Sequence, residues 1–143
     1  MSENCQHYIK ILFSLGHVNI TLYMAKNVLI VEDEFIIARV LDMQLSRHGF
    51  NVLGIADDKE SARKLFKKYD VDIIIMDILL KNREDGRELA VELNKIKETP
   101  VIFATGNSDA GTRGPAEELP FCVAVLIKPV SKEALLNAVN SIP

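Results

Sequence analysis

The chain has no tryptophan and only two cysteines, Cys5 and Cys122, among its 143 residues. Two cysteines this far apart exclude a disulfide scaffold and argue against a zinc site, so we expect a reduced, cytoplasmic location. Basic residues are not in excess either, since 17 lysines and arginines stand against 20 aspartates and glutamates. This balance predicts no direct binding of nucleic acid. No apolar run reaches the ~20 residues that cross a bilayer, so no membrane segment is expected.

The composition is that of one ordinary globular domain. Hydrophobic residues make up 48% of the chain and charged residues 26%, which excludes a disordered tail or a low-complexity linker. Five short apolar runs rich in valine and isoleucine lie at residues 28–31, 52–56, 71–76, 101–104 and 121–127. They are largely continuous rather than alternating, which is typical of strands that are covered on both faces.

Helical patterns lie between these runs. Their apolar stripes are Ile37, Leu41 and Leu45; Ala62, Leu65, Phe66 and Tyr69; Leu89, Leu93 and Ile96; and Leu135, Ala138, Val139 and Ile142. Gly49 is placed to end the first helix, Asp57 or Asp58 to cap the second, and Ser131 to cap the last. The alternation predicts an α/β fold, a flavodoxin-like doubly wound sheet of five parallel strands in the order 2-1-3-4-5.

The fourth crossover differs from the others. Residues 106–120 include Gly106, Gly111 and Gly114 as well as Pro115 and Pro120. Glycine costs about 1 kcal/mol and proline about 3 kcal/mol inside a helix. The segment therefore predicts a weak or absent fourth helix, at most a single turn opened by Pro115.

Residues 1–24 are interpreted as an N-terminal extension to a domain at residues 25–143. Apolar residues alternate with polar neighbours there, as in a strand; they are Ile9, Ile11, Phe13, Val18, Ile20 and Leu22. Two interpretations stay open. The extension is either a non-native start, with Met24 as the true first residue, or an added edge strand or dimer arm.

Polar side chains follow four of the five predicted strands. They are Glu32, Asp33 and Glu34 after the first strand, Asp77 after the third, Thr105 after the fourth and Lys128 after the fifth. Taken singly, each is explained as a helix-capping or loop residue. Taken together, they converge at one edge of the sheet, where doubly wound folds bind their ligands.

The chemistry of this set points to phosphoryl transfer. Three carboxylates in one pocket repel one another, and a divalent cation that prefers oxygen ligands, such as Mg²⁺, relieves the repulsion. A lysine and a hydroxyl beside them supply a charge and a donor for a phosphoryl group. A carboxylate nucleophile in such a pocket is suited to forming an acyl phosphate.

The sequence resembles the receiver domain of two-component response regulators. The matching pieces are Val-Leu-Ile-Val-Glu-Asp-Glu at 28–34, Ile-Ile-Met-Asp at 74–77, Asp-Gly at 85–86, Ala-Thr at 104–105 and Ile-Lys-Pro at 127–129. They cover residues 25–143, and as a set they are specific. The resemblance implies a phosphoacceptor signalling domain rather than an enzyme, with slow autodephosphorylation.

The resemblance also assigns roles to the residues that match. Asp77 would be the phosphoacceptor, and the phosphoryl group would come from a phosphohistidine on a histidine kinase or a histidine phosphotransfer protein. Asp33 and Asp77 would bind Mg²⁺ directly, Glu32 through water, and Leu79 through its backbone carbonyl. Thr105 and Lys128 would contact the phosphoryl group.

Two departures from the usual receiver pattern stand out. The aromatic switch residue three positions before the lysine is replaced by Val125. The motif Phe103-Ala104-Thr105-Gly106 resembles the "FAT GUY" subgroup, many of whose members work alone with HWE-type histidine kinases, although Asn107 replaces the aromatic residue that often follows. We therefore expect phosphorylation to order residues 106–120 instead of turning an aromatic ring.

Two other functions fit the sequence less well. A phosphatase that forms an aspartyl phosphate commonly has an acid two residues after its nucleophile, where this chain has Leu79. A flavodoxin-like electron carrier needs a phosphate-binding loop, and none follows Val31. Because no output domain follows the last helix, we expect a single-domain regulator that signals through a downstream protein partner or a phosphorelay.

Overall fold

The computed structural model describes residues 8–10, 21–107 and 110–143. Its main sheet has five parallel strands, ordered β4-β3-β5-β6-β7. The strands are β3 (Asn27–Val31), β4 (Asn51–Ala56), β5 (Ile73–Asp77), β6 (Val101–Thr105) and β7 (Cys122–Ile127). Counted along the sheet, this is the predicted order 2-1-3-4-5, so the predicted fold class is confirmed.

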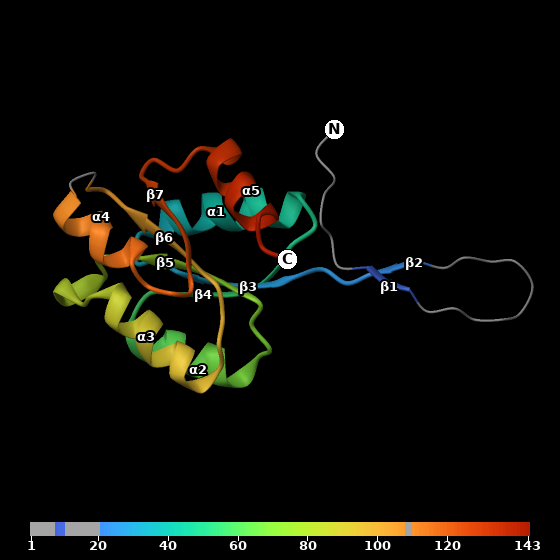
Figure 1. Cartoon of the computed structure of the whole chain (residues 1–143), viewed down its shortest axis with the longest axis horizontal. Coiled ribbons are helices and arrows are strands. Elements are labelled where there is room, and N and C mark those ends of the chain that lie inside the picture. Colours follow the sequence, from blue (N-terminus) through green and yellow to red (C-terminus); the bar gives the residue numbers. More distant parts are fainter. Residues whose placement is uncertain (1–7, 11–20, 108–109) are drawn as a thin grey trace, which may run out of the picture.

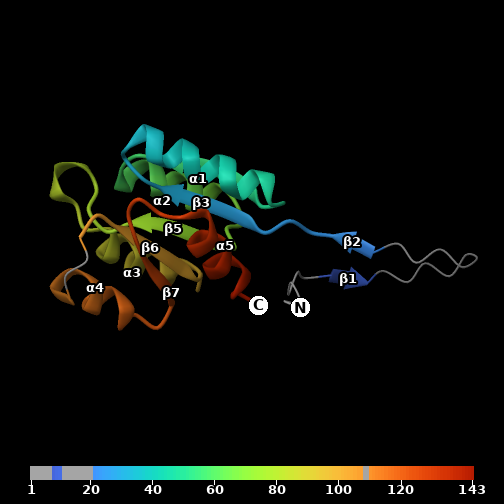
Figure 2. The same ribbon diagram turned by 90° about the horizontal axis from the view of Figure 1, so that it is seen from above.

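Helices cover both faces of the sheet (Figures 1 and 2). They are α1 (Phe35–Arg47), α2 (Lys59–Lys68), α3 (Gly86–Ile96), α4 (Ala110–Glu117) and α5 (Lys132–Asn140), with a 3-10 turn at Lys81–Arg83. Helices α1 and α5 pack on the side of the sheet that carries Val28 and Ile30. Helices α2, α3 and α4 cover the side that carries Leu29 and Val31. Both faces are apolar, which explains the continuous valine and isoleucine runs of the central strands.

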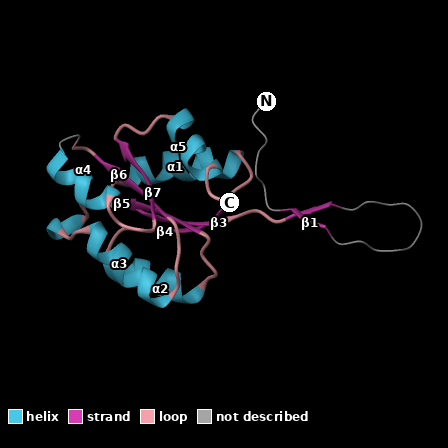
Figure 3. Cartoon of the chain, viewed as in Figure 1, coloured by secondary structure: helices cyan, strands magenta, loops and turns pink. Residues whose placement is uncertain are grey.

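Local capping residues explain where two helices begin and where another ends. The Asp58 carboxylate accepts a hydrogen bond from the Ser61 backbone N–H at 2.7 Å, so Asp58 rather than Asp57 caps α2. Ser131 caps α5 in the same way, since its hydroxyl accepts from the Ala134 N–H at 3.1 Å. Gly49 follows α1 with φ of 83°, a conformation that favours glycine. Figure 3 shows the resulting alternation of helix and strand.

The prediction of a weak or absent fourth helix was wrong in extent. Helix α4 covers eight residues with Pro115 inside it, rather than one turn that Pro115 opens. Packing outweighs the poor helix propensity of this segment. Ala116 of α4 is fully buried in the core, and Leu119, which follows the helix, packs against the same core. An ion pair between Arg113 and Glu117, one turn apart, adds a smaller contribution.

The N-terminal extension contains two short strands, β1 (Tyr8–Lys10) and β2 (Thr21–Tyr23). They pair antiparallel with each other and form a separate two-stranded sheet, so in the described residues neither is an edge strand of the main sheet. The chain runs from β2 into β3 beside the domain (Figure 2). Ile11, Phe13, Val18 and Ile20 lie outside the described residues. None of the helices in the described ranges is long and apolar enough to cross a bilayer.

Candidate functional site

The polar residues at the strand ends meet at one edge of the sheet. Val31 is paired in register with Met76, so Glu32 and Asp77 follow at the same level of adjacent strands. Asp77 is paired in turn with Ala104, and Thr105 with Ile127. Parallel pairing therefore places the ends of β3, β5, β6 and β7 side by side, as the sequence predicts.

Three of the carboxylates form a compact cluster. Glu32, Asp33 and Asp77 each offer an oxygen, and these atoms all lie within 4.8 Å of one another. Only 2% of Glu32 and 5% of Asp77 is exposed, while Asp33 is half-buried at the rim. Clustered oxygens in a buried pocket form the donor set that Mg²⁺ prefers, so these residues fit a divalent cation.

Lys128 is the counter-charge of the cluster. Its ammonium nitrogen lies 2.7 Å from Glu32 Oε2 and 2.9 Å from Asp77 Oδ2. The more exposed carboxylate of Glu34 is 3.9 Å away. Burial acts to lower the pKa of Lys128, but its hydrogen bonds to Glu32 and Asp77 outweigh burial and raise that pKa. Lys128 is therefore held in its charged form.

Glu32 is the carboxylate that the site perturbs most clearly. Burial raises the pKa of Glu32 from 4.5 to about 7, and the negative charge of Asp77 adds to the effect. The hydrogen bond from Lys128 opposes this shift, as does the backbone N–H of Glu34, which donates to Glu32 Oε1 at 3.1 Å. Near neutral pH the site thus holds Glu32 close to its titration point, where a bound cation would favour the ionised form.

Backbone groups fix the remaining polar atoms. The Leu79 N–H donates to Asp77 Oδ1 at 3.0 Å, so one oxygen of Asp77 faces the loop after β5 and the other faces Lys128. Thr105 is 4% exposed, and its hydroxyl oxygen accepts from the Asn107 N–H at 3.1 Å. The side chain of Leu79 points outward and is largely exposed. A ligand role for its carbonyl stays a prediction.

Gly86 is a residue whose position the sequence could not explain by itself. A Cβ atom at this position would lie 1.9 Å from the backbone oxygen of Asp77. The Gly86 N–H also donates to the carbonyl of Ile78 at 2.8 Å. The start of α3 therefore lies directly against the phosphoacceptor candidate, and only glycine permits so close an approach.

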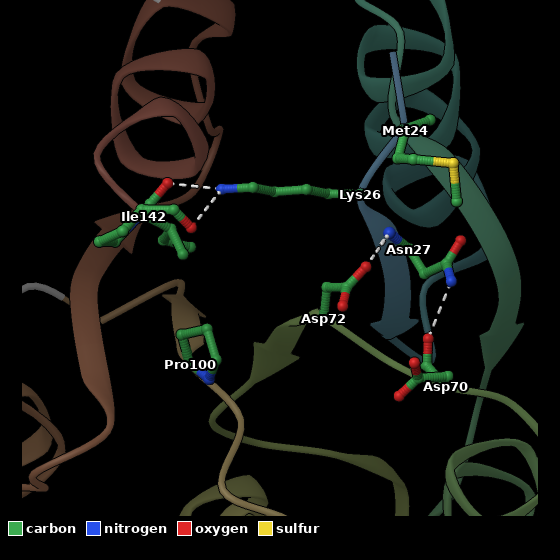
Figure 4. Close-up of a pocket in the computed structure, with 9 residues that line it drawn as sticks. Met24, Lys26, Asn27, Asp70, Asp72, Pro100 and Ile142 are labelled. Carbon is green, nitrogen blue, oxygen red and sulfur yellow. Dashed lines mark hydrogen bonds between the residues drawn. The ribbon is translucent and has the colours of Figure 1, made fainter. Parts of the chain in front are cut away.

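A separate hollow, of about 430 Å³, lies at the edge of the sheet opposite the acidic cluster, where β3 and β5 begin (Figure 4). Lys26 reaches across it and donates to the backbone oxygens of Ile142 at 2.5 Å and Pro143 at 2.9 Å. The Asn27 N–H donates to the carboxylate of Asp72 at 2.7 Å. These contacts join the start of β3 to the segment after α5 and to the residue before β5, far from the acidic cluster.

Known proteins resemble both the sequence and the fold. The sequence profile of the response regulator receiver domain matches residues 28–140. The probable transcriptional regulator ycf27 of Porphyridium aerugineum is 30% identical over 117 residues, which cover 82% of this chain and 48% of that protein. The phyllosphere-induced regulator PhyR of Methylorubrum extorquens is 31% identical over 115 residues, which cover 80% of this chain and 43% of that protein. The chain spans about half the length of these curated relatives.

Solved structures agree with this result. The response regulator PhyR from Brucella abortus matches with a TM-score of 0.74 and 26% identity, over 83% of this chain and 48% of that one. A response regulator from Burkholderia pseudomallei, with a phosphorylated aspartic acid, a calcium ion and citrate, matches with a TM-score of 0.71 and 28% identity. The match covers 79% of this chain and 65% of that one. The order of the strands, the acidic cluster and the matched profile lead to one conclusion: this chain belongs to the response regulator receiver domain family.

Proposed function

We propose that Asp77 accepts a phosphoryl group from a phosphohistidine on a histidine kinase or a histidine phosphotransfer protein. The observation that carries this proposal is the position of Asp77, which lies within 4.8 Å of two further carboxylates and 2.9 Å from Lys128. Mg²⁺ would be held by Asp33 and Asp77, by Glu32 through water and by the Leu79 carbonyl. When bound, it would supply positive charge to the phosphoryl oxygens.

Each side chain then has a part in the transfer. A carboxylate oxygen of Asp77 attacks phosphorus, the new P–O bond forms as the P–N bond of the phosphohistidine breaks, and the imidazole leaves. Lys128 moves its ion pair from the carboxylate to a phosphoryl oxygen. The Thr105 hydroxyl donates a hydrogen bond to another phosphoryl oxygen. The apolar side chain of Leu79 offers no acid for rapid hydrolysis of the product, which favours a signalling domain over a phosphatase.

The surface beside the site suits a protein partner. Phe35 and Ile36, at the start of α1, are 75% and 76% exposed. A groove of about 460 Å³ runs from α1 to the segment after β7 and is lined by Ile36, Val40 and Pro129 among others. Exposed apolar groups of this kind mark sites of protein contact. They support output by protein contact or phosphorelay. As a finer proposal, the chain acts in the cytoplasm and its kinase is of the HWE type, to which the motif Phe103-Ala104-Thr105-Gly106 points.

The proposal is tested by labelling the full chain with acetyl phosphate in Mg²⁺. Wild-type protein should gain one phosphoryl group by mass spectrometry, and Asp77→Ala should gain none while its thermal unfolding stays cooperative. Asp57→Ala is the control, because Asp57 follows the edge strand β4 and pairs with Lys81 outside the acidic cluster. Labelling that persists in Asp77→Ala, or fails in the wild type, would contradict the assignment.

A further inference from the structure

Two loops flank Asp77, and both are joined by hydrogen bonds to the same residue of α4. Thr105 ends β6 and the loop that follows it carries Asn107, while the loop after β5 carries Leu79. The residue in α4 is Thr112, which lies in the part of the helix nearest the site. A hollow of about 440 Å³ separates the two loops and is lined by Thr105, Leu79, Arg87 and Thr112 among others.

The first connection runs from Thr105 through Asn107. The Asn107 backbone N–H donates to the Thr105 hydroxyl oxygen at 3.1 Å. The side-chain amide of Asn107 donates to the Thr112 hydroxyl oxygen at 3.2 Å. A movement of Thr105 toward a phosphoryl group would therefore shift Asn107 and, through its side-chain hydrogen bond, the hydroxyl of Thr112.

The second connection runs through the loop after β5. The Leu79 N–H donates to Asp77, and Leu79 pairs with Asp85 in an isolated antiparallel bridge. The Asp85 carboxylate receives the guanidinium of Arg87, with Nε 2.9 Å from Oδ1 and Nη2 2.7 Å from Oδ2. The third nitrogen of that guanidinium, Nη1, donates to the Thr112 carbonyl at 3.4 Å.

A purely structural role does not account for this arrangement. Asp85 caps α3 by accepting from the Arg87 backbone N–H at 2.8 Å, and a cap of this kind needs no guanidinium. The planar guanidinium instead uses its fork to bind Asp85 on one side and extends its remaining nitrogen to α4 on the other. Arg87 thus bridges the loop of the phosphoacceptor and the helix across the hollow.

We propose that Arg87 is a positioning residue that couples the phosphorylation state of Asp77 to α4. The inference rests on the function proposed for Asp77. When a phosphoryl group draws Thr105 inward, the hydrogen bonds of Asn107 move the Thr112 side chain with it. Arg87 meanwhile holds the Thr112 carbonyl to the loop after β5. Helix α4 then responds as a unit. Val125 stands where the resemblance to other receivers implies an aromatic switch, and the route through Arg87 would take its place.

Arg63 offers a matched control. Its guanidinium binds Glu92 with the same fork geometry, Nε at 2.6 Å and Nη2 at 2.8 Å. That pair joins α2 to α3, and among the described residues it forms no hydrogen bond or ion pair with α4. Arg63→Ala therefore removes a similar ion pair of similar exposure without touching the proposed connection.

The test measures amide hydrogen exchange of α4 in the full chain, with and without beryllofluoride and Mg²⁺ as the probe. In wild type and Arg63→Ala the probe should slow amide exchange of residues 110–117 by at least ~5-fold. This is the low end of the coupling that is usual between two linked sites of a protein. In Arg87→Ala the change should fall below ~2-fold, while calorimetry shows the probe still bound within ~3-fold of the wild-type affinity. Arg87→Lys, which keeps the positive charge but has one nitrogen instead of the fork, should restore part of the response.

The outcomes separate the two proposals. If wild type binds the probe and α4 does not respond, or if Arg87→Ala responds as wild type does, the coupling is overturned while the function of Asp77 stands. If wild type fails to bind the probe, both proposals fall. Thermal unfolding of each variant checks that a lost response is not a lost fold, and Arg87→Lys serves as the second variant where Arg87→Ala is too unstable to measure.

Discussion

The Lys128 ammonium lies 2.9 Å from Asp77 Oδ2 and joins residues that are 51 positions apart in the chain. The contact places a positive charge where a cation or a phosphoryl group would also be drawn. In this state Lys128 partly neutralises the buried carboxylates of Glu32 and Asp77. A bound divalent cation and the Lys128 ammonium therefore compete for the same negative charge.

Replacing Lys128 should separate its two effects. We expect Lys128→Met to bind Mg²⁺ about 10-fold more tightly, because a neighbouring charge in a partly buried site is worth roughly 1–4 kcal/mol. Labelling by acetyl phosphate should become slower, because the phosphoryl oxygens lose their counter-charge. Titration calorimetry with Mg²⁺ and a labelling time course measure the two effects. Weaker Mg²⁺ binding would show that Lys128 does not compete with the cation.

The raised pKa of Glu32 predicts a pH-dependent affinity for Mg²⁺. With a pKa of about 7, Glu32 is mostly ionised at pH 8 and mostly protonated at pH 6. Mg²⁺ should therefore bind up to ~10-fold less tightly at pH 6 than at pH 8. Glu32→Gln should remove this dependence, whereas Glu34→Gln should keep it, because the Glu34 carboxylate lies largely in solvent. Calorimetry at both pH values is the measurement, and an unchanged slope in Glu32→Gln would rule Glu32 out as its source.

The same group affects folding in the absence of metal. The pKa of Glu32 is higher in the folded chain than its ordinary value of 4.5, so the folded state binds the proton more tightly. The stability that this proton contributes is fully present below about pH 4.5 and is lost as the pH rises through about 7. Thermal melts in EDTA should therefore show a larger fall in Tm between pH 5 and pH 8 for wild type than for Glu32→Gln.

Glycine substitutions should show how closely α3 approaches the site. In Gly86→Ala the new methyl group would meet the Asp77 carbonyl at 1.9 Å, so the backbone must move. We expect a loss of stability at the upper end of ~1–3 kcal/mol and slower labelling of Asp77. Gly114→Ala is the control, because apart from its chain neighbours and the backbone of its own helix nothing lies within 4 Å of its Cβ position inside α4. That variant should change stability by less than ~1 kcal/mol, because the better helix propensity of alanine is opposed by the strain of a side chain directly before Pro115. Urea unfolding of both variants measures the difference.

Much of the fold follows from the sequence because its local signals agree with its packing. The valine and isoleucine runs mark the strands, and β3, β5 and β6 are buried almost throughout. Ser131 has a hydroxyl at the position where α5 needs a cap. The acidic cluster could be predicted as well, because parallel strands bring their carboxyl ends to one edge of the sheet.

Other features depend on contacts that no local pattern encodes. Helix α4 forms despite Pro115, because Ala116 is buried against the sheet. The fork of Arg87 on Asp85 and its reach to Thr112 depend on how two loops pack, and sequence spacing gives no sign of the second contact. The third carboxylate near Lys128, that of Glu34, follows from the turn into α1.

The hydroxyl of Thr105 can be tested by a substitution that keeps its shape. Thr105→Val removes the donor to the phosphoryl group and the acceptor for the Asn107 N–H, so labelling of Asp77 should slow by at least ~10-fold. Thr99→Val makes the same change at another buried threonine, whose hydroxyl donates to the Lys97 carbonyl at 3.0 Å away from the site. Each variant should lose about 1 kcal/mol of stability, since each loses one hydrogen bond. Only Thr105→Val should lose labelling rate; equal rates in the two variants would show that Thr105 contributes packing and not phosphoryl binding.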